Sequence, residues 1–464
     1  MIVAGVLLIT LGWLLAYRLK DRFIRAYGAF FLVLLFFVVN KGQLNELAFF
    51  SAETTGPMSL LRWLTLGVLV LMALRVRKPD TMRADVVLGT LTALFLFDIL
   101  VSTTYAEDLS YSLMRAFSFV LMAIAVVFGF AFYLYWRASC LPFIRLHYYT
   151  ALCLLPTAMI LYLTGLSQYG AGVVMNQYAG PFSNQNLFGI FSALITPYVL
   201  FHWRMEATTR LLWWLDAGLL VVIFAGLWLS NSRGGMLATL IASTSYFFIV
   251  NLESRLKIIT LAICAVVVFT AFPNLQSSIT SFIRKDTIER AEVKNVQEQF
   301  REERRYSMWA GVFPIFWKEK MTGYGFATSH LQIFQFSGDK EAGRHVHNSY
   351  LELFGDLGLP GITLLLLILS RVAWCSVGLV QRDENHLQRN INATFIAIFL
   401  AGATNAFFES WLFSVGNIIS LVFWGPVAGI FAQWACSPAA TRNQVSFASA
   451  TPEFGYQNWQ PQGK

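Results

Sequence analysis

The sequence predicts an all-α fold, a polytopic membrane helix bundle of about 12–13 transmembrane helices with one large, partly helical loop. Three observations lead to this fold class. The 464 residues are 56% hydrophobic and only 13% charged, whereas soluble domains carry roughly 25% charged residues. The 41 Phe and 14 Trp residues suit lipid-facing helices with aromatic ends. Apolar runs of about 15–22 residues recur between short charged patches, which is typical of helices that cross a bilayer.

Thirteen apolar segments are predicted to be membrane helices, or twelve if one short segment is not a separate span. They cover residues 2–17, 26–39, 58–74, 84–103, 113–135, 148–164, 187–203, 211–229, 236–250, 258–272, 359–380, 391–408 and 418–434. The chain therefore divides into ten helices in residues 1–272, a loop at 273–358, three helices in 359–434 and a tail at 435–464. The tail is rich in Ser, Ala, Gln, Pro and Asn, which predicts a disordered cytoplasmic segment.

The basic residues of the short loops predict the orientation in the membrane. No basic residue precedes the first apolar run and four follow it, so this run is expected to stay as a helix with its N-terminus outside. Basic loops then alternate, and the long loop falls on the outside, which in a bacterial inner membrane is the periplasm. The net charge of +8 is spread over these loops. Because no basic domain stands apart from the membrane segments, nucleic-acid binding is not expected.

The long loop carries the most polar chemistry of the chain. Residues 273–360 hold three of the six histidines and eleven of the 34 Lys and Arg residues. Residues 286–309 are predicted to form a helix with Arg and Glu in i,i+4 pairs. The apolar and aromatic residues at 312–317, followed by two lysines, suit a segment at the membrane surface. Residues 323–326 then predict a turn, because they carry two glycines.

His347 is the candidate base of this loop. Asn348 or Ser349 can cap a short helix after it, and Gly358 and Pro360 are expected to end that helix. A histidine can accept a proton near neutral pH, as a general base must. The alternatives are a loop histidine that only forms a hydrogen bond, or a metal site built from the His-x-His pair and a carboxylate.

Two further outside turns carry groups that suit an anion or a sugar. Residues 229–235 place Arg233 at the outer mouth of the bundle, beside glycines that let backbone approach a ligand closely. The other interpretation of this arginine is a side chain that reaches lipid headgroups. Residues 180–186 place amide side chains at the same level, where they could bind sugar hydroxyls or cap the next helix.

Several common motifs are absent from the sequence. There is no G-x-x-x-x-G-K-[ST] phosphate loop, no Asp-x-Asp pair and no G-x-S-x-G nucleophile turn. Nucleotide hydrolysis and a metal-bound sugar nucleotide are therefore not expected. Asp98 is the main acidic residue within the predicted spans, whereas an ion-coupled transporter or a flippase usually carries several charges along its path.

An ordered set of motifs resembles the superfamily of O-antigen ligases and O-antigen polymerases over residues 180–430. The set is residues 230–234, Arg305 with Trp309, residues 323–325, then His347 and Asn348 with Gly358 ten residues further on. The family is usually drawn with both termini in the cytoplasm, whereas the segment count here places the N-terminus outside.

This resemblance implies metal-independent, inverting glycosyl transfer at the periplasmic face of the inner membrane, without a cofactor. The donor would be a glycan on undecaprenyl diphosphate, and the acceptor a sugar of the lipid A core for a ligase or a lipid-linked repeat unit for a polymerase. More distant alternatives are a protein O-oligosaccharyltransferase and a non-enzymatic lipid-linked oligosaccharide flippase. The resemblance assigns the catalytic role to His347 and diphosphate binding to Arg233 and Arg305. Supporting candidates are Arg304 and His345, which are alternatives to Arg305 and His347 in register, with Arg344, Asn348, Asn184, Asn186 and Ser232.

Overall fold

The computed structural model describes residues 22–40, 57–76, 85–137, 140–165, 172–174, 177–182, 184–250, 304–332, 346–382, 385–414 and 418–435. In these ranges the chain is helical apart from turns and one small antiparallel ribbon, β1 (Gly172–Val174) with β2 (Gln177–Gly180). The all-α polytopic fold predicted from the sequence is confirmed. Eight of the described helices are long and apolar enough to cross a membrane.

The described helices follow the predicted segments closely. Segments 2–17 and 258–272 lie outside the described residues, and every other predicted segment overlaps a helix. These helices are α2 (Arg22–Asn40), α4 (Pro57–Leu74), α5 (Val86–Ser102), α6 (Leu109–Met122), α7 (Phe130–Arg137), α8 (Leu141–Leu163), α9 (Gln185–Met205), α10 (Arg210–Ser230), α11 (Arg233–Val250), α17 (Ser349–Gln381), α18 (His386–Asn405) and α19 (Ile418–Ala435). The domain boundaries, the side of the N-terminus and the cytoplasmic tail remain predictions.

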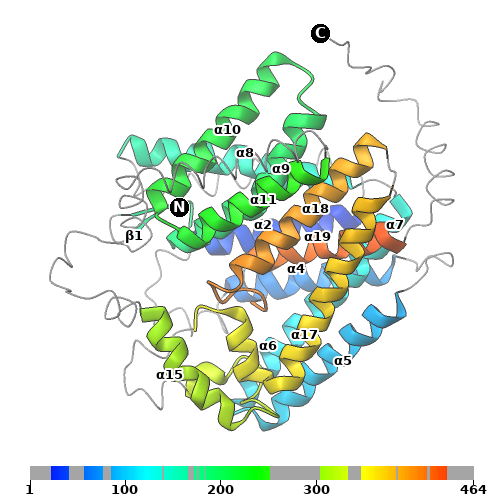
Figure 1. The fold of residues 1–464 in the computed structure, drawn as a ribbon, viewed down its shortest axis with the longest axis vertical. Coiled ribbons are helices and arrows are strands. Elements are labelled where there is room, and N and C mark those ends of the chain that lie inside the picture. Colours follow the sequence, from blue (N-terminus) through cyan, green and yellow to red (C-terminus); the bar gives the residue numbers. More distant parts are fainter. Residues whose placement is uncertain are drawn as a thin grey trace, which may run out of the picture.

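Helices α9, α11 and α18 pack against one another at the centre of the bundle (Figure 1). In the most apolar 18-residue stretch of α9, 83% of the residues are buried by protein. In the corresponding stretch of α10, at the periphery, only 28% of the residues are buried. Helices α9 and α11 approach closely because glycines face each other, and a Cβ on Gly235 would lie 2.5 Å from the Cα of Gly189. Small residues allow such close helix contacts in membrane proteins. This contact brings the first turns of α9 and α11 together.

The end of the bundle opposite to these first turns holds a separate polar cluster. Asp216 of α10 is fully buried and accepts hydrogen bonds from the Tyr148 hydroxyl at 2.5 Å and from the His202 ring at 2.7 Å. Arg145 pairs with Glu206 nearby at 2.9 Å. These contacts tie α8, α9 and α10 together, since each helix contributes one or more of the side chains.

Helix α17 contains a sharp kink that separates a short arm, residues 349–357, from the long membrane segment. The Asn348 side chain caps the arm and accepts from the backbone N–H groups of Tyr350 and Leu351, both at 3.0 Å. Gly358 adopts φ 64° and ψ −159°, a conformation open almost only to glycine. The predicted stop at Gly358 is therefore a kink, because the chain turns there and resumes the helix at once.

The glycine turn after α15 (Arg304–Lys318) docks on this kink. The N–H of Tyr324 donates to the carbonyl of Gly355 at 2.9 Å, and the N–H of Leu359 donates to the carbonyl of Lys320 at 2.6 Å. Helix α15 itself ends at Lys318 rather than at 309 as predicted; of the predicted range, residues 286–303 lie outside the described part. It continues through residues 312–317 because Val312 and Phe316 pack against the arm.

We expect Gly358→Ala to lower the free energy of unfolding by about 1–3 kcal/mol, because alanine is strained at this backbone conformation. A Cβ there would also lie 2.7 Å from the carbonyl oxygen of Lys320. The loss should appear as a lower melting temperature of the purified protein in detergent. Gly311→Ala in α15 is the matched control, since a Cβ at Gly311 meets nothing within 4 Å. Equal melting temperatures for both variants would contradict the structural role of the kink.

Candidate functional site

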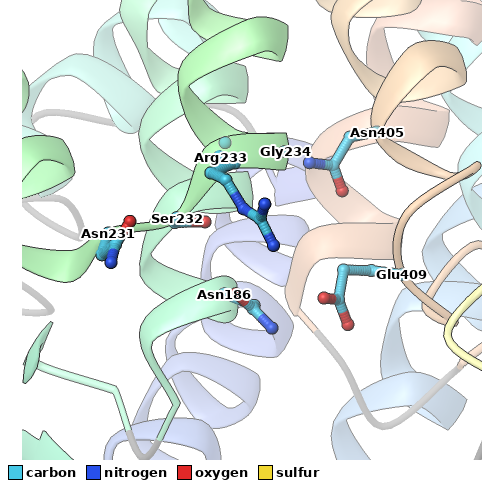
Figure 2. Close-up of a pocket in the computed structure, with 8 residues that line it drawn as sticks. Asn186, Asn231, Ser232, Arg233, Gly234, Asn405 and Glu409 are labelled. Atoms are coloured by element: carbon cyan, nitrogen blue, oxygen red, sulfur yellow. The ribbon is translucent and has the colours of Figure 1, made fainter. Parts of the chain in front are cut away.

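A polar pocket lies where helices α9 and α11 begin and α18 ends. It encloses about 400 Å³ of space, part of which is open to solvent. Figure 2 shows the Arg233 side chain extending into the space between Asn186 and Glu409. A lining of amides, a guanidinium and a carboxylate suits a ligand rich in oxygen atoms, such as a phosphate or a sugar. The lining residues are Asn186, Asn231, Ser232, Arg233, Gly234, Gly235, Asn405 and Glu409.

The N-terminal ends of helices α9 and α11 form the side of the pocket with positive potential. The Asn184 side chain caps α9 by accepting from the N–H of Asn186 at 2.7 Å. Asn231 ends α10 in the left-handed conformation, with φ 50°, and α11 begins two residues later at Arg233. The positive ends of both helix dipoles therefore lie beside the Arg233 guanidinium. Together they create a region of positive potential that favours a bound anion.

His347 pairs with Glu409 at the other side of the pocket. Its Nδ1 lies 3.0 Å from Oε2 of Glu409. An ionised carboxylate can only accept hydrogen bonds, so this contact makes Nδ1 the protonated nitrogen and leaves Nε2 of the neutral ring with its lone pair. The side chain of His347 is 38% exposed, whereas that of Glu409 is 13% exposed. The histidine is accessible to a ligand, while the carboxylate behind it is shielded.

The backbone at His347 is held in an uncommon conformation. His347 has φ 50°, in the left-handed region that costs a non-glycine residue about 1–3 kcal/mol. Hydrogen bonds on both sides maintain it. Before the histidine, Nε1 of Trp309 donates to the carbonyl of Val346 at 2.7 Å. After it, the N–H of Asn348 donates to the Ser410 hydroxyl at 3.1 Å. The imidazole position is therefore determined by contacts from α15 and from the segment after α18.

Ser349 attaches the start of α17 to the segment that carries Glu409. Its hydroxyl donates to the carbonyl of Glu409 at 2.7 Å and accepts from the N–H of Trp411 at 3.1 Å. Its own N–H donates to the carbonyl of Ala406 at 2.8 Å. One side chain thus ties together two segments about 60 residues apart in the sequence. This contact explains how Glu409 reaches His347.

The predicted site residues fall into three groups in the structure. Asn186, Ser232 and Arg233 line the pocket. His347 is not in the lining, but it pairs with Glu409, which is. Asn184 and Asn348 act as helix caps. Arg304 and Arg305 begin α15 with side chains outside the described part, and Arg344 and His345 lie outside the described residues altogether. Trp309, one helical turn after Arg305, contacts the backbone next to His347, which brings the start of α15 toward this side of the site.

Glu409 and Asn405 were not among the residues predicted from the sequence. Glu409 carries the only charge of the short outside loop predicted at residues 409–417, which is the signal that could have identified it. Asn405 lies inside an apolar run that predicts a membrane helix, so its role in a pocket was hidden. Within the ranges that the structure describes, no group of three or more His, Cys, Asp or Glu side chains could hold a metal ion.

We expect Glu409→Gln to lower kcat for the reaction at His347 by about 10- to 100-fold, since the amide carries no charge to stabilise a protonated imidazole. The KM for a ligand held by Arg233 should change less than about twofold, because the change affects the reacting state more than binding. Steady-state kinetics in detergent would measure both constants. Glu107→Gln is the control, because Glu107 contacts Gln332 outside the pocket. If kcat is unchanged in Glu409→Gln, the carboxylate of Glu409 has no part in the reaction.

Comparison with known families supports the resemblance seen in the sequence. Residues 218–366 match the family model described as O-antigen ligase. The matched range is about a third of the chain and includes Arg233, Arg305 and His347. It ends before Asn405 and Glu409, which the structure adds to the pocket. A comparison with curated proteins found no match.

Proposed function

We propose that the protein transfers a glycan from a polyprenyl-diphosphate-linked donor to a hydroxyl group of an acceptor sugar. The observation that carries the proposal is the His347–Glu409 pair at 3.0 Å beside a pocket that also holds Arg233. The match to the O-antigen ligase family supports lipid-linked glycan transfer in general. The donor, the acceptor and the steps below are our assignment.

The acceptor hydroxyl is activated by His347 in this proposal. Its oxygen attacks the anomeric carbon of the donor sugar, and its proton moves to Nε2 of the imidazole. Glu409 accepts a hydrogen bond from the N–H at Nδ1 and stabilises the imidazolium that forms, as a buried carboxylate does for a catalytic histidine in hydrolases. Because the attack is a single displacement, the configuration at the anomeric carbon inverts.

The leaving group is the lipid diphosphate, which gains negative charge as the glycosidic C–O bond breaks. Arg233 neutralises this charge with its guanidinium fork, and the starts of α9 and α11 add to the positive potential. Arg305 is assigned to the same diphosphate, because it lies one turn before Trp309 on the helix that contacts the His347 segment. The bond to diphosphate already stores the free energy of transfer, so no nucleotide is consumed.

We propose that the site lies at the outer face of the inner membrane of a bacterium. The starts of α9, α11 and α17 and the end of α18 share one end of the bundle, and the alternation of basic loops assigns this end to the periplasm. A polyprenyl diphosphate would enter from the bilayer between helices, while the acceptor approaches from the water or from a neighbouring lipid.

The acceptor separates a ligase from a repeat-unit polymerase, and the glycans of a deletion strain would distinguish them. Lipid A core without O-chains, together with accumulated lipid-linked polymer, identifies a ligase. Core that carries a single repeat unit identifies an O-antigen polymerase. Intact lipopolysaccharide with missing exopolysaccharide identifies a polymerase for that polymer. Loss of glycan from protein alone would identify a protein O-oligosaccharyltransferase.

Purified protein with a lipid-linked donor and an acceptor in detergent tests the proposed chemistry directly. Transfer without added nucleotide, with release of free polyprenyl diphosphate, is the expected result. A protein that moves the donor across vesicle bilayers but forms no glycosidic bond would instead be a flippase. That outcome would overturn the proposal.

A further inference from the structure

Asn405 places an unsatisfied hydrogen-bond donor in the wall of the pocket. The residue is 1% exposed and sits at the last position of α18. Its side-chain nitrogen, Nδ2, is buried and has no hydrogen-bond partner among the residues that the structure describes. A buried donor without a partner destabilises the protein, so such a group is expected to meet an acceptor when the site is occupied.

The orientation of this amide is determined by its neighbour. Nε1 of Trp411 donates a hydrogen bond to the Asn405 side chain at 3.1 Å. An indole N–H can only donate, so it requires the oxygen Oδ1 as its acceptor. The donor Nδ2 must therefore face the opposite way. Figure 2 shows this nitrogen directed toward Gly234 and Arg233.

Gly234 lies beside the Asn405 amide without a side chain. A Cβ at Gly234 would lie 3.6 Å from Nδ2 and 3.2 Å from the Cβ of Phe408. A side chain at this position would therefore pack between the amide and the pocket, whereas glycine leaves only backbone beside it. Arg233 is the adjacent residue, so a guanidinium and an amide donor border the same part of the pocket.

We infer that Nδ2 of Asn405 donates a hydrogen bond to a phosphate oxygen of the donor's diphosphate, beside the guanidinium of Arg233. The inference rests on the proposed function and adds a binding residue outside the range matched by the family model. The acceptor is assigned to phosphate because the two side chains that border this part of the pocket, Arg233 and Asn405, each offer N–H donors, and a phosphate oxygen accepts from both. The carboxylate of the lining, Glu409, pairs with His347.

Binding of undecaprenyl diphosphate that carries no sugar tests this assignment. Asn405→Ala should raise its Kd about tenfold or more, since a hydrogen bond to a charged group is lost. Asn405→Asp keeps the size of the side chain but opposes two negative charges, and it should raise the Kd by at least about 100-fold. Thr404→Val is the control, because Thr404 is the neighbouring residue and its hydroxyl is bonded to the carbonyl of Leu400 on the exposed face of α18.

Trp411→Phe provides a second variant that leaves Asn405 itself in place. Without the indole N–H, the amide can rotate, and we expect a Kd increase of about threefold to tenfold. Melting temperatures in detergent identify variants that fail to fold, and only folded variants are compared. If Asn405→Ala destabilises the protein, Gly234→Ala replaces it, since the added methyl group should weaken binding by covering Nδ2.

The outcomes separate the inference from the proposed function. Undecaprenyl diphosphate binding that is equal in wild type, Asn405→Ala and Asn405→Asp overturns the inference, and glycan transfer by the wild type would leave the proposed function standing. If only the KM for the glycan-bearing donor changes, Asn405 contacts the sugar and the assignment to phosphate is wrong. If the wild-type protein binds the lipid diphosphate but forms no glycosidic bond, the proposed transfer is wrong. The inference about Asn405 would still stand in that case.

Discussion

His347→Ala is expected to abolish glycan transfer, with a fall in kcat of about 10²- to 10⁴-fold, the contribution of a general base. The physical reason is the loss of the only imidazole that pairs with Glu409 at the pocket within the described residues. Transfer from a lipid-linked donor to its acceptor, followed by gel or mass spectrometry, measures the effect. Protein level and membrane insertion should be unchanged.

The backbone at His347 requires a second variant. Because φ is 50° there, alanine, which adopts the left-handed conformation less readily than histidine, lowers the stability as well as removing the base. Asparagine tolerates this conformation better, so His347→Asn tests the imidazole with less effect on stability. His330→Ala is the control, since His330 lies against Tyr111 outside the pocket. Full activity in His347→Ala together with an inactive His345→Ala would move the catalytic role to His345.

Arg233→Ala is expected to reduce kcat/KM by more than tenfold, which corresponds to about 1.4 kcal/mol or more of transition-state stabilisation. Its guanidinium borders the pocket at the start of α11, where the diphosphate is assigned. Arg233→Lys keeps the charge but loses the planar fork, so it should recover activity only in part. Arg305→Ala is expected to have an effect of the same size as Arg233→Ala.

Kinetics with the lipid-linked donor would measure these losses, and kcat should fall along with donor affinity because the charge develops in the transition state. Arg210→Ala is a matched control, since this exposed arginine begins α10 at the opposite end of the bundle. Transfer that survives both Arg233→Ala and Arg305→Ala would argue against an arginine clamp on the diphosphate.

The helices were predictable because each depends on local composition. An apolar run long enough to cross a bilayer must form a helix, since lipid offers no partner for backbone polar groups. The helix cap at Asn348 was predictable for the same reason, because it depends only on residues within one helical turn. Gly358 was recognised as a breaker, but its kink depends on the docking of Lys320 from another segment.

The pocket could be predicted only in part. Arg233 stood out because charged residues are rare in the predicted outside turns of this apolar chain, and His347 because it directly precedes a predicted helix cap. Glu409 did not, because its partner lies 62 residues away and only the packing of α17 against the segment after α18 brings them together. Asn405 was hidden for a related reason, since the direction of its side-chain donor depends on Trp411 and its neighbour there is Gly234, and both lie on other segments or turns.

The fold class and the helical segments within the described residues followed from the sequence alone, because hydropathy is a local property. Glycan transfer was inferred from the resemblance of an ordered set of motifs, which includes Arg233 and His347. Which side chains share the pocket became visible only in the folded structure. The pairing of His347 with Glu409 joins residues 62 positions apart, and the direction of the Asn405 amide depends on Trp411 in the segment after α18, so neither contact can be read from local composition.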